Sequence, residues 1–315
     1  MRNLLVAAVV IGVGGYFGAK LYVQHKAARD LDQVLTQARP IVDVQYESVV
    51  ATLEGELRVE GITIRMPQFD DPIKIESVSV RTPSFLFLVG FDNRGRNFEF
   101  PERLGVAVTG LRASVDADYM EVLKDARGVS VANVELTPAD RCASTYGLTP
   151  TALKRFGYYE LDIDFNIDVR RSGGDELVFD IGTLVEDMYA LDVTATFSGL
   201  ADPTALARGA RPLLVDARLD YIDHSLNSRI LKYCAEQQVT AQDVVEAQLR
   251  EIQAMARETG MELDEMIIAP YSDFLLGKQR FTIMSQPPRP IDLTRIGLYK
   301  PSDVPNLLNL TAEAG

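Results

Sequence analysis

Strict alternation of apolar and polar residues marks the centre of the chain. In the stretch YELDIDFNIDV, from Tyr159 to Val169, apolar residues occupy the odd positions, and acidic or amide residues occupy the even positions. Runs near 177–181, 189–197 and 213–221 alternate in the same way. A period of two places each kind of residue on its own side of a strand. The pattern therefore predicts a four-strand antiparallel meander with one apolar and one polar face.

The same period runs through an earlier part of the chain, with interruptions. It slips by one residue at Gly61 and again at Glu76-Ser77, which is typical of a β-bulge. The apolar stretch PSFLFLVG predicts one further short strand. We therefore expect a β-rich N-terminal region over 41–118, followed by a helical insert over 119–157.

The C-terminal part changes to helical spacing. Ser225 and Thr240 are expected to begin two helices, and a third is expected over about 263–276 with a break at Pro270. The apolar face of the meander must be covered, and these helices are suited to form its lid. The prediction is an α+β fold that is mainly antiparallel sheet. Its meander and helical lid span 158–300, with a last strand near Phe281. A C-terminal tail follows over 301–315, with a short helix at 302–310.

The first 40 residues differ from the rest. Leu4 to Ala19 carries no charge and continues past Lys20, so about 20 residues are long enough to cross a bilayer as a helix. The segment is either a cleaved signal peptide or a permanent anchor. A cleavage site needs small residues, and Phe17 stands in the way at the end of the segment, which favours the anchor. We predict a transmembrane helix with a stalk over 1–40.

Charge restricts the partners. The formal net charge is −13, while four basic residues and one acidic residue lie in the first 30 positions. An acidic body repels phosphate backbones, so no nucleic-acid partner is expected. The basic residues on both sides of the apolar segment leave its orientation open. The strand-rich body favours a single-pass protein with its body outside the cytoplasm.

Candidate chemical sites are few. Asp162, Asp164 and Asp168 share one strand face, where neighbours lie roughly 6.5–7 Å apart, too far to chelate one calcium ion together. This acidic row therefore predicts a solvated face. No nucleophile motif is present, and the adjacent His224 and Ser225 do not make a triad. We predict no catalytic residue, metal or cofactor, and no enzyme.

Two smaller constellations have structural interpretations. Arg218, Asp220, Asp223 and Arg229 are expected to form one ion-pair cluster where the last meander strand meets a helix. Within the apolar N-terminal segment, GVGGYFG does not have nucleotide-loop spacing. Its Gly14 and Gly18 form a G-x-x-x-G pair, which lets two membrane helices approach closely in a homo-oligomer or serves as ordinary small residues.

The chain has two cysteines, Cys142 and Cys234. They lack C-x-x-C spacing, and the chain has only two histidines, so a zinc site is not expected. In an oxidising compartment they could form a disulfide closing a loop of about 90 residues, which would contribute about 4–5 kcal/mol. The alternative is a pair of buried free thiols.

Several stretches resemble a known class of envelope protein. GELRVEGITIRMP, PIKIESVSVRTPSFLFL and PERLGVAVTGLRASV are similar to strand units of AsmA-type proteins and their YdgA-like relatives. The segments LDYIDHSLNSRILKYCAEQQVTAQDVVEAQL and FTIMSQPPRPIDL resemble uncharacterised proteobacterial periplasmic proteins. The resemblance implies a single-pass protein of a Gram-negative inner membrane, with long antiparallel sheets and a part in lipid traffic. This chain is shorter than those proteins, and no catalytic residue carries over.

These observations lead to one main functional expectation and one alternative. The main expectation is a non-enzymatic, membrane-anchored periplasmic protein that binds membrane lipid or another envelope component on its amphipathic sheet. It requires a groove between sheet and lid, whereas a filled core would exclude it. The alternative is a structural subunit of an inner-membrane complex without a lipid ligand.

Overall fold

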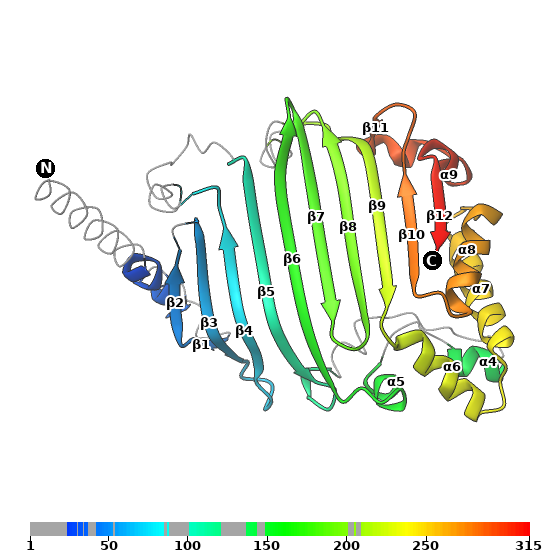
Figure 1. Ribbon diagram of the computed structural model, residues 1–315, viewed down its shortest axis with the longest axis horizontal. Coiled ribbons are helices and arrows are strands. Elements are labelled where there is room, and N and C mark those ends of the chain that lie inside the picture. The colour runs from blue at the N-terminus through cyan, green and yellow to red at the C-terminus, as the bar shows by residue number, and fades with distance from the viewer. Residues whose placement is uncertain are drawn as a thin grey trace, which may run out of the picture. The chain divides into compact units, whose positions relative to one another are not determined.

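The computed structural model describes the chain in several stretches, which form two compact units, residues 1–111 and 112–315 (Figure 1). The described residues are 24–29, 31–33, 35–36, 42–52, 54–84, 87, 101–120, 137–143, 149–200, 205 and 209–315. The predicted membrane segment with Gly14 and Gly18 lies outside them, as does most of PSFLFLVG. Within these stretches, no helix combines the length and apolar character needed to span a bilayer.

The first unit consists of antiparallel strands, from the three residues of β1 to the twelve of β5. Strands β1 and β2 both pair with β3, and β3 pairs with β4. The strand order in this unit is β1-β3-β4-β5. The bounds are β1 (Asp43–Gln45), β2 (Ser48–Ala51), β3 (Glu56–Arg65), β4 (Ile73–Arg81) and β5 (Arg103–Ser114).

The two predicted slips lie opposite each other. Glu60 pairs with Ser77 and Ile62 with Ile75, so Gly61 and Glu76 stand between these pairs with no extra residue in either strand. The bulge prediction is therefore wrong, because a bulge sets two residues against one. In β3 and β4, the alternation of apolar and polar residues is interrupted at positions that face each other, so the pairing register of the two strands does not change.

The interruption belongs to a row of four residues that we call the crease: Gly61, Glu76 and Gly110 on β3, β4 and β5, and Glu47 between β1 and β2. Gly61 and Gly110 have φ values of +65° and +62°. A Cβ on Gly61 would lie 2.4 Å from the Glu47 side chain, and a Cβ on Gly110 would lie 2.7 Å from Cβ of Glu76. In both places a glutamate occupies the space that the glycine leaves open.

Gly110→Ala is expected to lower the free energy of unfolding by about 2 kcal/mol, because alanine is strained at positive φ and must also displace Glu76. Urea unfolding followed by circular dichroism measures the loss. Gly174→Ala is the matched control, since Gly174 has φ +57° and a Cβ there would meet nothing within 4 Å. Equal losses in the two variants would rule out the contact with Glu76.

The second unit contains the predicted meander. Strands β6 to β9 pair in sequence, and β10 and β12 continue the sheet in the order β6-β7-β8-β9-β10-β12, with β11 pairing β9. Its strands are β6 (Glu160–Gly173), β7 (Glu176–Val185), β8 (Tyr189–Ser198), β9 (Leu213–Asp223), β10 (Arg280–Ser285), β11 (Ile291–Asp292) and β12 (Leu310–Ala314). The meander prediction is confirmed, whereas β12 was not anticipated in the C-terminal tail.

Helices begin at the positions that the capping residues in the sequence predict. Thr240 and Asp243 form a reciprocal capping box at the start of α7, and Thr149 caps α5. Helices of the second unit include α4 (Pro138–Ala143), α5 (Pro150–Arg155), α6 (Leu226–Glu236), α7 (Ala241–Glu258), α8 (Glu265–Leu275), η3 (Leu293–Leu298), η4 (Pro301–Asp303) and α9 (Val304–Leu307). The predicted break at Pro270 is wrong, because α8 continues through it. Pro270 removes one backbone donor from the helix. Burial of Phe274 and Leu275 in the next turn stabilises the helix despite this loss.

Helix α8 packs beside β10 and β12, and α7 packs on α8 (Figure 1). Helices α4 and α6 pack on each other and on α7. Val245 of α7 and Phe274 and Leu275 of α8 form a buried cluster with Phe281 of β10. A disulfide between Cys142 of α4 and Cys234 of α6 ties the short helix to this layer, with the Cα atoms 5.5 Å apart. The lid is thus a connected helical layer anchored on one end of the sheet.

Candidate functional site

One face of the second unit's sheet is apolar over five strands. Cross-strand pairing places five aliphatic side chains in one row from β6 to β10: Ile167, Ile181, Val193, Leu219 and Ile283. The adjacent row runs through Phe165, Thr183, Leu191, Tyr221 and Phe281. Paired residues share a face, so these rows form one continuous apolar surface.

Burial along this face is uneven. Phe281, under the helices, is 8% exposed, whereas Ile181 on β7 is 37% exposed. Ile167 and Val193 are only half-buried. In the part of the chain that the structure describes, the helical cover therefore concentrates at the β9–β12 end. The face over β6 to β8 remains partly accessible.

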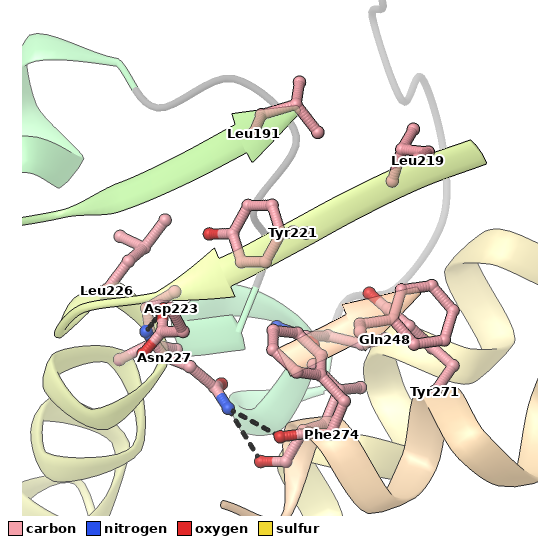
Figure 2. A pocket seen from close by; sticks show the side chains of 12 residues that line it. Leu191, Leu219, Tyr221, Asp223, Leu226, Asn227, Gln248, Tyr271 and Phe274 are labelled. Carbon is pink, nitrogen blue, oxygen red and sulfur yellow. Dashed lines mark hydrogen bonds between the residues drawn. The ribbon is translucent and has the colours of Figure 1, made fainter. Parts of the chain in front are cut away.

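A cavity of about 350 Å³ lies between this face and the helices, which is within the range of about 300–1,000 Å³ typical of small-molecule sites (Figure 2). Strand residues line one side: Leu191, Leu219, Tyr221 and Phe281. Helical residues line the other: Leu226, Ile230, Tyr271, Phe274 and Leu275. Because Leu191, Leu219 and Tyr221 belong to the apolar rows, the cavity opens onto the same surface.

Three polar residues complete the lining: Asp223, Asn227 and Gln248. The Asn227 side chain donates hydrogen bonds to the carbonyl oxygens of Phe274 and Leu275 at 3.3 and 3.0 Å (Figure 2). The backbone N–H of Asn227 donates to Asp223 Oδ1 at 2.9 Å. Burial raises the pKa of the Asp223 carboxyl, and that hydrogen bond partly opposes the shift. The start of α6 thus fixes a carboxylate at the cavity wall.

The predicted four-residue ion-pair cluster divides into two separate groups. Asp220 accepts hydrogen bonds from Arg218 at 2.9 Å, from Arg280 at 2.9 Å and from Thr282 at 2.7 Å. The hydrogen bond from Arg218 lowers the pKa of Asp220 most. Arg229 instead lies 4.2 Å from the centroid of the Tyr158 ring. The single cluster is therefore wrong, because residues 220 and 223 point to opposite faces of one strand.

The acidic row of β6 also differs from its prediction. Arg112 donates to Asp162 at 3.2 Å. Asp168 is 8% exposed and pairs with Asp180 across the sheet, so this part of the face is not solvated. Among the residues whose placement is described, no three acidic, histidine or cysteine side chains gather as a metal site would require.

Ser225 has a structural environment. Its hydroxyl lies 2.8 Å from the Tyr158 hydroxyl and donates to the backbone carbonyl of Asp187. These contacts join the starts of β6 and α6 to the β7–β8 turn. Nothing in this arrangement gives Ser225 the partners of a nucleophile.

Sequence patterns did not show which helical residues line the cavity. Tyr271 and Phe274 lie three positions apart on α8, a spacing that signals a common helix face. That signal shows an apolar face but not which strand it meets. The contact of Phe274 with Tyr221, at a ring-centroid distance of 5.4 Å, depends on the placement of α8.

One family model matches part of the chain. A family model described as "Uncharacterized protein" matches residues 183–315, which include every residue that lines the cavity. No curated protein matches the chain. No solved structure matches it either.

Proposed function

We propose that this protein is a non-enzymatic binding protein that holds an acyl chain of a membrane lipid on the apolar face of β6–β10. The observation that carries the proposal is the cavity of about 350 Å³, which is continuous with a partly accessible apolar surface. An acyl chain is flexible and apolar, so it can follow a shallow surface that offers few hydrogen-bonding groups.

The uneven burial supports this proposal over a sheet used only as a core. A filled core buries its central side chains almost completely, whereas Ile181 stands 37% exposed in the middle of a row. Exposed contiguous apolar surface is typical of sites that bind a ligand, a membrane or a partner. The cavity at one end of the surface favours a ligand with a long tail.

The proposed location is the periplasmic side of an inner membrane, with the apolar N-terminal segment as the anchor. The disulfide between Cys142 and Cys234 supports an oxidising compartment. An anchor would keep the apolar face close to the source of lipid, while the negative charge of the chain would keep the body from lying on an anionic bilayer.

The alternative remains a structural subunit of an inner-membrane complex, with a protein covering the exposed row. The half-buried Ile167 and Val193 would then be interface residues. Native mass spectrometry of the detergent-extracted protein separates the two proposals. We expect a mass increment that dissociates as lipid, and a protein that never carries lipid would contradict acyl-chain binding.

A charged side chain in the apolar row should weaken lipid binding. Val193→Lys places an ammonium group among Ile181, Leu219 and the bound chain, where it is poorly solvated. The expected result is at least about a tenfold loss of affinity for a fluorescent fatty-acyl probe, corresponding to about 1.4 kcal/mol. Fluorescence titration provides the measurement.

Thr194→Lys is the matched control, because it adds the same charge to the next residue on the opposite face. Thr194 lies across from Asp180, so a lysine there meets a carboxylate. Its probe affinity should stay close to that of the unmodified protein. If both variants bind the probe normally, the apolar face does not hold the chain.

A further inference from the structure

The proposed acyl-chain site has a chemical preference for one kind of head group. We propose that the cavity, which is lined by Asp223 and by several aromatic rings, recognises amphiphiles that carry an ammonium group. This inference rests on the proposed function and specifies the class of ligand.

The charge of the cavity lining is the first observation. Asp223 is the one charged side chain among the twelve residues that line the cavity. No lysine, arginine or histidine lines it, so the head group of an anionic amphiphile would meet a carboxylate without a compensating cation. Like charges placed together in a partly desolvated site are strongly unfavourable, whereas an opposite charge is attracted.

Aromatic residues around the cavity are the second observation. Tyr221, Tyr271, Phe274 and Phe281 all line it. The ring centroids are 5.4 Å apart for Tyr221 and Phe274, and also 5.4 Å apart for Tyr271 and Phe281. Aromatic faces attract cations through the ring quadrupole, and several rings around a cavity are a recurring way of binding alkylammonium groups. The rings and the carboxylate therefore favour the same ligand charge.

The position of the carboxylate is the third observation. Asp223 ends β9, and its Oδ1 is held by the backbone N–H of Asn227. Asn227 is in turn fixed to α8 through the carbonyl oxygens of Phe274 and Leu275. Because strand, helix start and lid hold this side chain together, the carboxylate is preorganised and loses little side-chain entropy when a ligand binds.

The test compares three amphiphiles with one tail, dodecylamine, dodecanol and dodecanoate, by isothermal titration calorimetry at neutral pH. Dodecylamine and dodecanoate are kept below their critical micelle concentrations, and dodecanol is kept below its aqueous solubility limit. We expect dodecylamine to bind at least about tenfold more tightly than dodecanoate, with dodecanol between them. Lysophosphatidylethanolamine is added as a fourth ligand. Its binding would identify a lipid head group as the source of the ammonium, and binding of dodecylamine alone would indicate a free amine.

Asp223→Asn removes the charge and keeps a residue that caps a helix start as well as aspartate does. The preference for dodecylamine over dodecanol should fall to within about twofold. Asp192→Asn is the control, since Asp192 is an exposed carboxylate on the opposite sheet face. Tyr271→Leu offers a second variant, which is expected to weaken amine binding more than it weakens dodecanol binding.

The outcomes separate the two proposals. If none of the amphiphiles binds, the acyl-chain function fails and the head-group inference fails with it. If dodecanoate binds as tightly as dodecylamine, or if Asp223→Asn keeps the amine preference, the ammonium inference is overturned while acyl-chain binding stands.

Discussion

Replacing both cysteines, Cys142→Ala with Cys234→Ala, should lower the free energy of unfolding of the second unit by about 4–5 kcal/mol. The disulfide joins residues 92 positions apart, so its loss restores a large amount of chain entropy to the unfolded state. Cys234 is fully buried, which makes alanine a better replacement than serine because it adds no polar group. Urea unfolding followed by circular dichroism gives the free-energy difference.

Reduction of the unmodified protein is the control for this double variant. If the cross-link rather than the loss of two side chains is responsible, reduced protein and double variant should unfold at nearly the same urea concentration. An unfolding midpoint that is unchanged in both would show that the link between α4 and α6 does not stabilise the fold.

Asp220→Ala should lower the free energy of unfolding by about 3 kcal/mol. Hydrogen bonds to charged groups contribute about 1.5–3 kcal/mol each. The expected loss is smaller than their sum because both arginines are half exposed to solvent. Asp220 is buried, and its carboxylate is the common acceptor for side chains of β9 and β10. Its removal leaves Thr282, which is 1% exposed, without that acceptor. Urea unfolding at neutral pH measures the loss.

Asp192→Ala is the matched control, since Asp192 is an exposed carboxylate directly across from Asp220. It should change stability by less than about 0.5 kcal/mol.

The stability that Asp220 contributes should depend on pH, because the pKa of its carboxyl is lowered in the folded protein. The contribution is complete above the usual aspartate pKa of about 3.9 and is lost as the pH falls below that value. Identical acid unfolding of Asp220→Ala and the unmodified protein would contradict this role.

The meander could be predicted from sequence because its alternation is long and uninterrupted. The run from Tyr159 to Val169 leaves one choice of buried face, and a slip of one residue would expose every apolar side chain. Helix starts were equally readable, since Thr240 and Asp243 act locally through hydrogen bonds to neighbouring backbone groups. Local signals of this kind need no knowledge of tertiary structure.

The candidate site needed information that the chain does not carry locally. Arg280 and Thr282 reach Asp220 because β10 pairs with β9 in a particular register, although 60 and 62 residues separate them. Separating Asp220 from Asp223 was possible from sequence, because an odd spacing on a strand reverses the face. Strand β12, LTAEA, has weak β-propensity and forms by pairing with β10. The cavity required both this register and the placement of α8.

The crease has a consequence for how the first sheet could grow or slide. Each glutamate in it fits against a glycine of the adjacent strand, as Glu76 does against Gly110. Displacing one strand by a single residue would press that glutamate against a neighbour that has a Cβ. The row therefore fixes the register of these strands. A duplicated hairpin could extend this sheet only if it placed a glycine opposite the glutamate of the neighbouring strand.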